Sequence, residues 1–140
     1  MGSGMAMTGA LAGVRIIDVT NVFMGPSATQ LLGDLGADVI KVESPQGDST
    51  RAIGPCGKEK MGPLYLGLNR NKRSIVLDLK QPAGIEALLR LAKDADVLAY
   101  NVRPQAMQRL GLGYEALAAI NPRLIYCAIS GYGQTGPLRD

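Results

Sequence analysis

The sequence contains no histidine and no tryptophan, and it has a single phenylalanine among its 140 residues. Without histidine, these residues offer no imidazole to act as a general base or as a metal ligand. We therefore exclude a Ser/His or Cys/His catalytic pair and predict no metal site. Because aromatic side chains are scarce, aliphatic side chains and Met must fill the core, and hydrophobic residues make up 46% of the chain.

Cysteine, long apolar runs and excess charge are also scarce. The two cysteines, Cys56 and Cys127, lie far apart with no Cys-x-x-Cys spacing, which favours a reduced, cytoplasmic protein. No apolar run reaches membrane-spanning length, so we predict no membrane partner. The net charge of +3 comes from cations interspersed with acidic residues, which argues against a nucleic-acid partner. Residues 1–9 lack the pattern of a signal peptide, and we interpret them as a disordered start left by expression.

Short branched-aliphatic runs alternate with segments of helical period along the rest of the chain. This alternation is typical of a parallel sheet covered by helices on both faces, so we predict one Rossmann-like, doubly wound α/β domain over residues 10–140. The predicted strands are residues 14–19, 38–42, 74–79, 97–100 and 124–129. The predicted helices begin at residues 25, 82, 103 and 114, and the first of them ends at Gly36.

The two longest predicted helices each carry an apolar stripe at i, i+3, i+4 and i+7 spacing. The stripes are Ala28, Leu31, Leu32 and Leu35 in the first helix, and Ile85, Leu88, Leu89 and Ala92 in the second. This period predicts that both stripes face the core. Residues 44–63, rich in glycine, proline and charge, form a predicted long loop with ligand or subunit contacts.

Two glycine-rich segments match the dinucleotide-binding fingerprint, but neither has its full context. Residues 111–116 follow a predicted helix instead of a strand, so a helix stop and restart explains them better. Residues 131–136 follow a predicted strand, yet Pro137 intervenes where a helix should begin. An NAD-dependent enzyme stays an alternative, which would require NADH to bind.

Open parallel sheets bind ligands outside the carboxyl ends of their strands. In this chain the helix start at Gly25-Pro26 and the side chains of Lys80, Arg103 and Arg109 follow such ends, so we predict an anion site there. A phosphate group on a bulky cofactor would suit that site.

Other charged residues near strand ends have different expected roles. Three further cations, Arg70, Lys72 and Arg73, precede the predicted third strand, and we expect them to serve the fold or a subunit contact. Asp18 is expected to order the turn that follows the first strand, and Asp140 to be a frayed chain end.

Several ordered motifs at matching spacing resemble the family III coenzyme A transferases, the carnitine and bile-acid CoA-transferase family that includes the α-methylacyl-CoA racemases. The motifs are residues 11–18 (LAGVRIID), 25–26 (GP), 30–43 (QLLGDLGADVIKVE), Gly47-Asp48 with Arg51, 69–74 (NRNKRS), 77–80 (LDLK), 95–97 (ADV) with Asn101 and Arg103-Pro104, 109–111 (RLG), and 131–137 (GYGQTGP). The resemblance covers residues 11–137.

The resemblance implies a Rossmann-like domain that binds CoA across its strand ends, in a subunit that interlocks with its twin as a homodimer. It implies that Val22, Phe23 and Met24 line the pantetheine and acyl end. It also implies nucleotide contacts from Leu77, Lys80, Asn101, Val102, Arg103 and Arg109. Ser44 would lie at the adenine or phosphate contact, although the family often has Arg there. Phe23-Met24 likewise replaces a smaller pair before the Gly-Pro motif.

In the family's transferases, an Asp carboxylate attacks the acyl-CoA thioester, and CoA then passes to a carboxylic acid acceptor. The resemblance puts that Asp beyond residue 140, so we assign no catalytic residue in this chain. We expect a truncated N-terminal portion that binds CoA thioesters without turnover. The alternatives are a fragment of an α-methylacyl-CoA racemase and a stand-alone CoA-binding module.

Overall fold

A computed structural model of the chain describes residues 8–55 and 57–139. The expectations for residues 1–7, Cys56 and Asp140 lie outside the described residues. The elements in chain order are β1 (Arg15–Val19), α1 (Met24–Asp34), β2 (Asp38–Glu43), the 3-10 helix η1 (Ser49–Ala52), α2 (Pro63–Asn69), β3 (Lys72–Val76), α3 (Pro82–Lys93), β4 (Val97–Tyr100), α4 (Pro104–Arg109), α5 (Tyr114–Ile120) and β5 (Ile125–Ala128).

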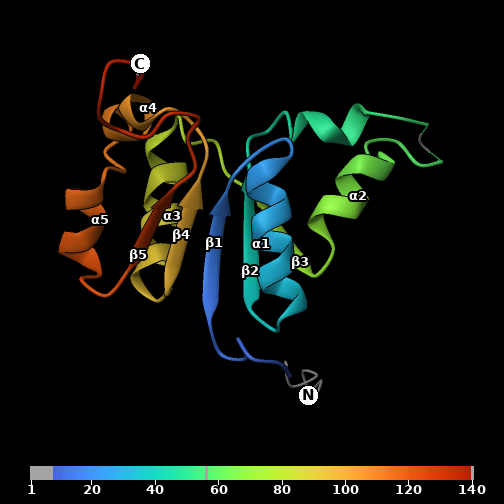
Figure 1. The fold of residues 1–140 in the computed structure, drawn as a ribbon, viewed down its shortest axis with the longest axis horizontal. Coiled ribbons are helices and arrows are strands. Elements are labelled where there is room, and N and C mark those ends of the chain that lie inside the picture. Colours follow the sequence, from blue (N-terminus) through green and yellow to red (C-terminus); the bar gives the residue numbers. More distant parts are fainter. Residues whose placement is uncertain (1–7, 56, 140) are drawn as a thin grey trace.

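The strands form a five-stranded sheet in the order β3-β2-β1-β4-β5, and all of its pairs are parallel. This arrangement confirms the predicted Rossmann-like α/β fold. The strand order reverses between β1 and β4, which is where open sheets of this kind form a ligand-binding crevice. The carboxyl ends of the strands point to the upper edge in Figure 1, where α4 and the loops around η1 also lie.

One face of the sheet is apolar and packs on α3, α4 and α5. Ile17 of β1 lies opposite Ile40 of β2 and Leu98 of β4, and all three side chains are buried. Leu88 of α3 and Leu117 of α5 belong to the same apolar cluster. The predicted stripe of α3 is confirmed, because Leu88 and Ala92 are fully buried while Ile85 and Leu89 pack against the cluster.

The other face of the sheet is covered by α1, with α2 beside it (Figure 1). This face contains buried charged side chains. Asp18 of β1 lies opposite Lys41 of β2, and Glu43 follows Lys41 on the same face. All three residues are buried. Period-2 alternation within β1 and β2 therefore gives each strand one apolar side and one side that becomes polar toward its carboxyl end.

The predicted stripe of α1 is wrong for three of its four residues, because Leu31 and Leu35 are 57% and 50% exposed and Ala28 is exposed as well. The fourth, Leu32, packs against the apolar cluster of Ile16 and Val39 as predicted. The buried side of α1 instead consists of Gly25, Pro26, Thr29, Gln30 and Gly33. Small and polar residues fit there because the helix packs on the charged face of the sheet. A Cβ atom at position 33 would lie 3.3 Å from the Asn71 carbonyl oxygen.

The third strand also differs from the prediction, since it begins at Lys72 and ends at Val76 instead of spanning residues 74–79. Asn71, with φ at 61°, directs the chain into the strand, and the Asp78 side chain accepts a bond from the Lys80 amide in the loop that follows. Lys72 and Arg73 thus lie inside the strand.

The predicted loop at residues 44–63 contains η1, and α2 begins at its last residue. Helix α2 was not predicted. At the beginning of the described chain, Thr8 and Gly9 lie against Gly36 at the end of α1.

Candidate functional site

A cavity of about 540 Å³ opens at the carboxyl edge of the sheet. Its size is that of a site for a small ligand or part of a cofactor. The ends of β1, β2 and β4, the β3–α3 loop and α4 supply its walls. The lining residues are Val19, Asn21, Val42, Glu43, Ser44, Gln46, Leu77, Asp78, Leu79, Lys80, Val102, Ala106, Met107, Arg109 and Leu110.

The cavity combines an apolar interior with two exposed cations. Val42, Val102 and Leu110 contribute aliphatic walls, while Lys80 and Arg109 bring positive charge. Among the residues that the structure describes, none forms an ion pair with Lys80 or Arg109. An apolar surface beside two such cations can hold a planar apolar group together with an anionic one.

The structure brings half of the predicted site residues into this cavity. Ser44, Leu77, Lys80, Val102 and Arg109 line it. The other five lie outside the lining set: Val22, Phe23, Met24, Asn101 and Arg103.

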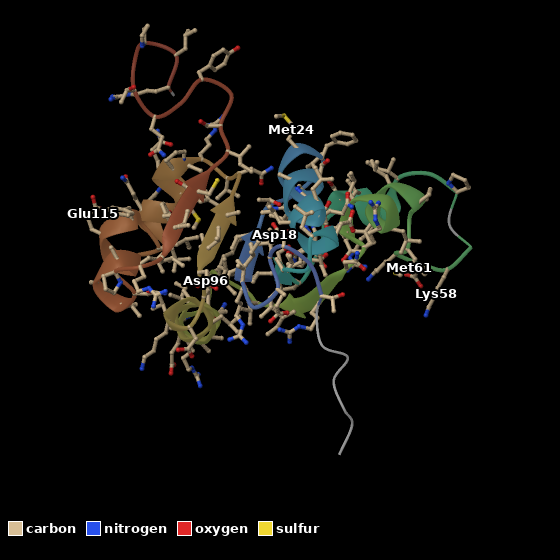
Figure 2. The ribbon with its side chains drawn as sticks, turned by 60° about the horizontal axis from the view of Figure 1, so that its bottom comes forward. Asp18, Met24, Lys58, Met61, Asp96 and Glu115 are labelled. Atoms are coloured by element: carbon tan, nitrogen blue, oxygen red, sulfur yellow. The ribbon has the colours of Figure 1, made fainter. Side chains whose placement is uncertain are left out.

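Four of these residues lie in the loops that follow β1 and β4, and Met24 is the first residue of α1. Val22, Phe23 and Met24 are exposed, and Figure 2 shows Met24 at the outer end of α1, away from the buried Asp18. Asn101 reaches into the β1–α1 turn with its side-chain amide, and Arg103 is the residue before α4. Of the predicted anion site, Lys80 and Arg109 line the cavity. Gly25 and Pro26 do not line it and are buried in the first turn of α1.

The three cations predicted to precede the third strand are ion-paired with carboxylates. Arg70 contacts Asp34, and Arg73 contacts Asp38, each at 2.7 Å. Lys72 contacts Asp18 at 2.9 Å. These ion pairs serve the fold, which is one of the two roles expected for the three cations. Of the four cations between residues 70 and 80, only Lys80 lines the cavity.

Lys72 and Asp18 form a fully enclosed pair beneath α1. The Lys72 ammonium also donates to the Pro26 carbonyl, the Thr29 hydroxyl and the Asn69 side-chain oxygen, at 2.8–2.9 Å. Burial lowers the pKa of Lys72, and the Asp18 charge opposes this effect. Asp18 also accepts from the Thr20 amide, so it orders the turn after β1 as predicted.

A second cluster surrounds Glu43 at the end of β2. Arg51 donates two bonds of 2.7 Å to the Glu43 carboxylate, and Tyr65 and Ser74 donate one each. Burial would raise the pKa of Glu43, but these bonds and one from the Asp48 amide outweigh it and lower the pKa to about 2. Burial and the bond to Glu43 raise the pKa of Tyr65 to about 12. Glu43 is therefore a carboxylate over the whole physiological range.

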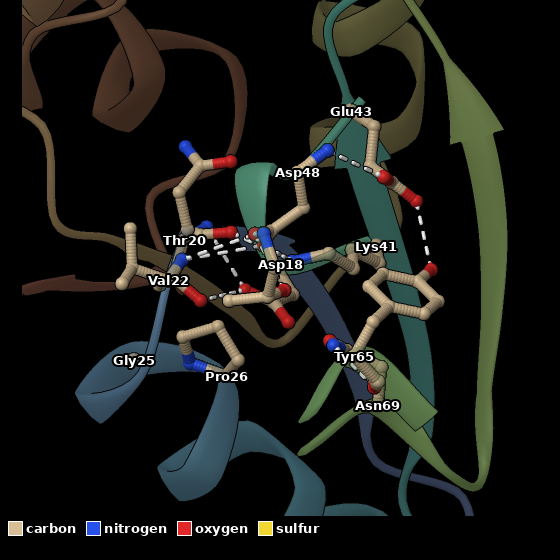
Figure 3. A network of polar contacts seen from close by, with 12 residues as sticks. Asp18, Thr20, Val22, Gly25, Pro26, Lys41, Glu43, Asp48, Tyr65 and Asn69 are labelled. Carbon is tan, nitrogen blue, oxygen red and sulfur yellow. Dashed lines mark hydrogen bonds and ion pairs between the residues drawn. The ribbon is translucent and has the colours of Figure 1, made fainter. Parts of the chain in front are cut away.

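Lys41 and Asp48 form a further ion pair, which bonds to Glu43 and to the turn after β1 (Figure 3). Their charged atoms are 3.1 Å apart and both side chains have no exposed surface. Bonds from Thr50 and Lys41 lower the pKa of Asp48 against the opposing effect of burial.

Sequence reasoning missed these buried charges as a connected set. The signal was present in the strands, because Asp18, Lys41 and Glu43 interrupt aliphatic runs at alternating positions. Such alternation indicates that one sheet face holds charges, but it does not reveal which distant loop supplies the partners.

Two searches of the described residues gave negative findings. No cluster of three or more Cys, Asp or Glu side chains suited to a metal ion occurs within residues 8–55 and 57–139. Over the same residues, no helix combines the length and the apolar character that a membrane crossing requires.

The sequence profile of CoA-transferase family III matches residues 11–140 of the chain. Succinate–glutarate CoA-transferase from Agrobacterium fabrum is 48% identical over 137 residues, which cover 93% of this chain and 34% of that protein. Acetyl-CoA:oxalate CoA-transferase from Acetobacter aceti is 51% identical over 132 residues, which cover 93% of this chain and 33% of that protein.

A crystal structure of a CaiB/BaiF family protein from Brucella suis superposes with a TM-score of 0.89 at 44% identity, covering 94% of this chain and 36% of that one. The chain thus spans about a third of the length of the curated relatives. Since the family profile extends over nearly all of its residues, the chain belongs to CoA-transferase family III.

Proposed function

We propose that residues 10–140 form the CoA-binding domain of a transferase that moves CoA between an acyl-CoA thioester and a carboxylic acid. The observation that carries the proposal is the cavity at the carboxyl edge of the sheet, with Lys80 and Arg109 beside aliphatic walls, in a chain of this family. The transfer would proceed through a covalent aspartyl intermediate, with the nucleophilic carboxylate outside these 140 residues.

The chemistry of the cavity fits the nucleotide part of CoA. Aliphatic side chains such as Leu77 and Val102 suit the faces of an adenine ring, and Lys80 and Arg109 suit phosphate oxygens. Val22, Phe23 and Met24, exposed beside the same edge of the sheet, suit the less polar pantetheine and acyl part. Assigning the nucleotide part to the cavity and the pantetheine and acyl part to Val22, Phe23 and Met24 agrees with what the family resemblance implies.

The names of the similar proteins favour transfer over racemisation. The relatives from Agrobacterium fabrum and Acetobacter aceti are named as CoA-transferases of dicarboxylic acids, succinate with glutarate and oxalate respectively. We accordingly propose a carboxylic acid acceptor for the whole protein. On the strength of the resemblance, we also propose a cytoplasmic, interlocked homodimer.

Calorimetric titration of the chain with CoA tests the binding proposal. We expect Lys80→Ala and Arg109→Ala each to weaken CoA binding by about tenfold or more, because each removes a charge-assisted bond to phosphate. Arg73→Ala is the matched control, since it removes the same charge from the opposite end of the sheet, where Arg73 pairs with Asp38. That control should bind CoA like the parent chain.

Two results would contradict the proposal: equal CoA binding by all four proteins, or no CoA binding by any of them. NADH binding in the absence of CoA binding would instead favour a dinucleotide-dependent enzyme.

A further inference from the structure

The turn between β1 and α1 contains a residue in an unfavourable backbone conformation. Val22 has φ at 69°, in the left-handed region that favours glycine. A β-branched side chain is poorly suited to that region, and such a conformation persists only where surrounding groups hold it. The structure contains such groups on three sides of the turn.

The first support is the buried ion pair between Lys41 and Asp48. The Asp48 carboxylate accepts a bond of 3.2 Å from the Val22 amide, while the Lys41 ammonium donates a bond of 2.8 Å to the Thr20 carbonyl. One ion pair therefore holds the backbone on both sides of Asn21 (Figure 3). Asp48 is itself fixed by Thr50, whose amide and hydroxyl both donate to it.

The second support is Asn101, the residue that follows β4. Its side-chain oxygen accepts from the Asn21 amide at 2.9 Å, and its side-chain nitrogen donates to the Asn21 carbonyl at 2.8 Å. This paired contact bridges β1 and β4, where the strand order reverses. The Asn101 amide is thus directed at the turn and not into the cavity.

The third support is the close approach of α1 to the turn. A Cβ atom at Gly25 would lie 2.4 Å from the Thr20 Cβ, so the helix can begin this close only with glycine at that position. Together these contacts hold Thr20, Asn21 and Val22 in place.

A fixed turn has a consequence for the three side chains that it presents. Val22, Phe23 and Met24 are 49%, 54% and 72% exposed, and the neighbouring Asn21 lines the cavity. Apolar side chains held outward on a rigid backbone can bind a flexible ligand without a further cost of ordering the loop. The contacts that hold Val22 in its strained conformation therefore also fix where these side chains lie at the edge of the cavity.

We propose that Lys41, Asp48 and Asn101 are positioning residues, which hold the strained turn so that Val22, Phe23 and Met24 meet the pantetheine and acyl part of a CoA thioester. This proposal rests on the proposed function, with the nucleotide part of the ligand in the cavity. It differs from the resemblance at Asn101, to which the family pattern assigns a nucleotide contact.

The experiment compares two ligands, acetyl-CoA and adenosine 3′,5′-bisphosphate, which lacks the pantetheine part. The test variants are Asn101→Ala, which frees Asn21, and Asp48→Asn, which removes the charge that pairs with Lys41 and accepts from the Val22 amide. Asp38→Asn is the matched control, because it neutralises an ion-paired carboxylate at the opposite edge of the sheet, outside the cavity lining. Amide exchange at residues 21 and 22 measures the turn itself without any ligand.

We expect both test variants to speed amide exchange in the turn and to weaken acetyl-CoA binding by about fivefold or more. Their affinity for the bisphosphate should not change, and the control should resemble the parent chain in every measurement. If Asn101→Ala fails to fold, the isosteric variant Asp48→Asn still decides the outcome.

The proposal is overturned by unchanged exchange, by unchanged acetyl-CoA affinity, or by equal weakening of both ligands. Equal weakening in Asn101→Ala would indicate a direct nucleotide contact or a purely structural role. Failure of the parent chain to bind either ligand would instead reject the proposed function, and the positioning role with it.

Discussion

The two faces of the sheet use different chemistry, although alternate residues of the same strands supply both. On the face toward α3 and α5, Ile17, Ile40 and Leu98 pack without polar partners. On the face toward α1 and α2, Asp18 and Lys41 are buried with charged partners. Apolar packing is non-directional, whereas a buried charge requires specific partners at specific distances. The charged face can therefore fix the shape of loops in a way that the apolar face cannot.

The contacts of the charged face support this difference. Lys41 bonds to the Thr20 carbonyl, and Glu43 accepts from the Asp48 amide, so both residues reach loops at the carboxyl edge. The apolar face stabilises the domain, while the charged face shapes the edge where the cavity lies. Substitutions on the two faces should consequently differ in the free energy of unfolding that they remove, in the pH dependence of that loss, and in their effect on ligand binding.

The largest expected effect follows from removing one partner of a buried pair. Lys72→Met leaves the Asp18 carboxylate buried without its ammonium partner, so the free energy of unfolding should fall by about 3–5 kcal/mol. Arg73→Met, which removes a 65% exposed side chain from the same strand, should cost less than about 1 kcal/mol. Urea unfolding at neutral pH measures both. Equal effects would mean that the Asp18–Lys72 pair is hydrated.

On the apolar face, Leu88→Ala should reduce the free energy of unfolding by about 3 kcal/mol, because it leaves a cavity at a residue with no exposed surface. This loss should be the same at neutral and at mildly acidic pH, since the cluster consists of aliphatic, Met and Tyr side chains and includes no carboxylate. Repeating the urea unfolding of the variant and the parent at both pH values tests that expectation. If the free energy lost in Leu88→Ala grew on acidification, the stability of the apolar cluster would depend on a titrating group of the charged face.

Acid should weaken the charged face through Glu43. Its pKa is lowered from 4.5 to about 2 in the folded chain, so its contribution is complete above 4.5 and is lost as the pH falls toward 2. Between about pH 6 and about pH 3 the parent should lose on the order of 2 kcal/mol more than Glu43→Gln. Urea unfolding of both proteins at these two pH values measures the difference. If the parent and Glu43→Gln lost the same free energy of unfolding on acidification, Glu43 would have the same pKa in the folded and unfolded chains.

The sequence predicts the fold well because strand and helix periods are local properties. Branched-aliphatic runs located all five strands, and the period of α3 correctly identified Leu88 and Ala92 as buried. Helix α2 was missed because its short, glycine-containing segment owes its place to contacts such as Tyr65 with Glu43, which are distant in sequence.

The site was predictable only in part, for a related reason. Lys80 was predicted because it follows a strand end, where parallel sheets bind ligands, and Arg109 was predicted to join it in one anion site; both line the cavity. The partners of Lys41 and Asp48 could not be found, since they come from backbone groups of a turn whose shape depends on those same contacts. The structural role of Asn101 was hidden likewise, because its bonds join segments 80 residues apart.

The smallest expected effect concerns the helix whose exposed side was wrongly predicted. Leu31 of α1 and Leu88 of α3 occupy equivalent positions in two apolar stripes, yet Leu31 is 57% exposed and Leu88 has no exposed surface. Periodicity cannot distinguish them, because it reports that one side of a helix is apolar and not what covers that side. Leu31→Ala should therefore change the free energy of unfolding by no more than about 0.5 kcal/mol, against about 3 kcal/mol for Leu88→Ala. Measuring both variants by urea unfolding separates the two interpretations of α1. A cost at Leu31 as large as that at Leu88 would show that the stripe is buried in the chain in solution, and that α1 packs on the sheet with the side that the sequence period predicted.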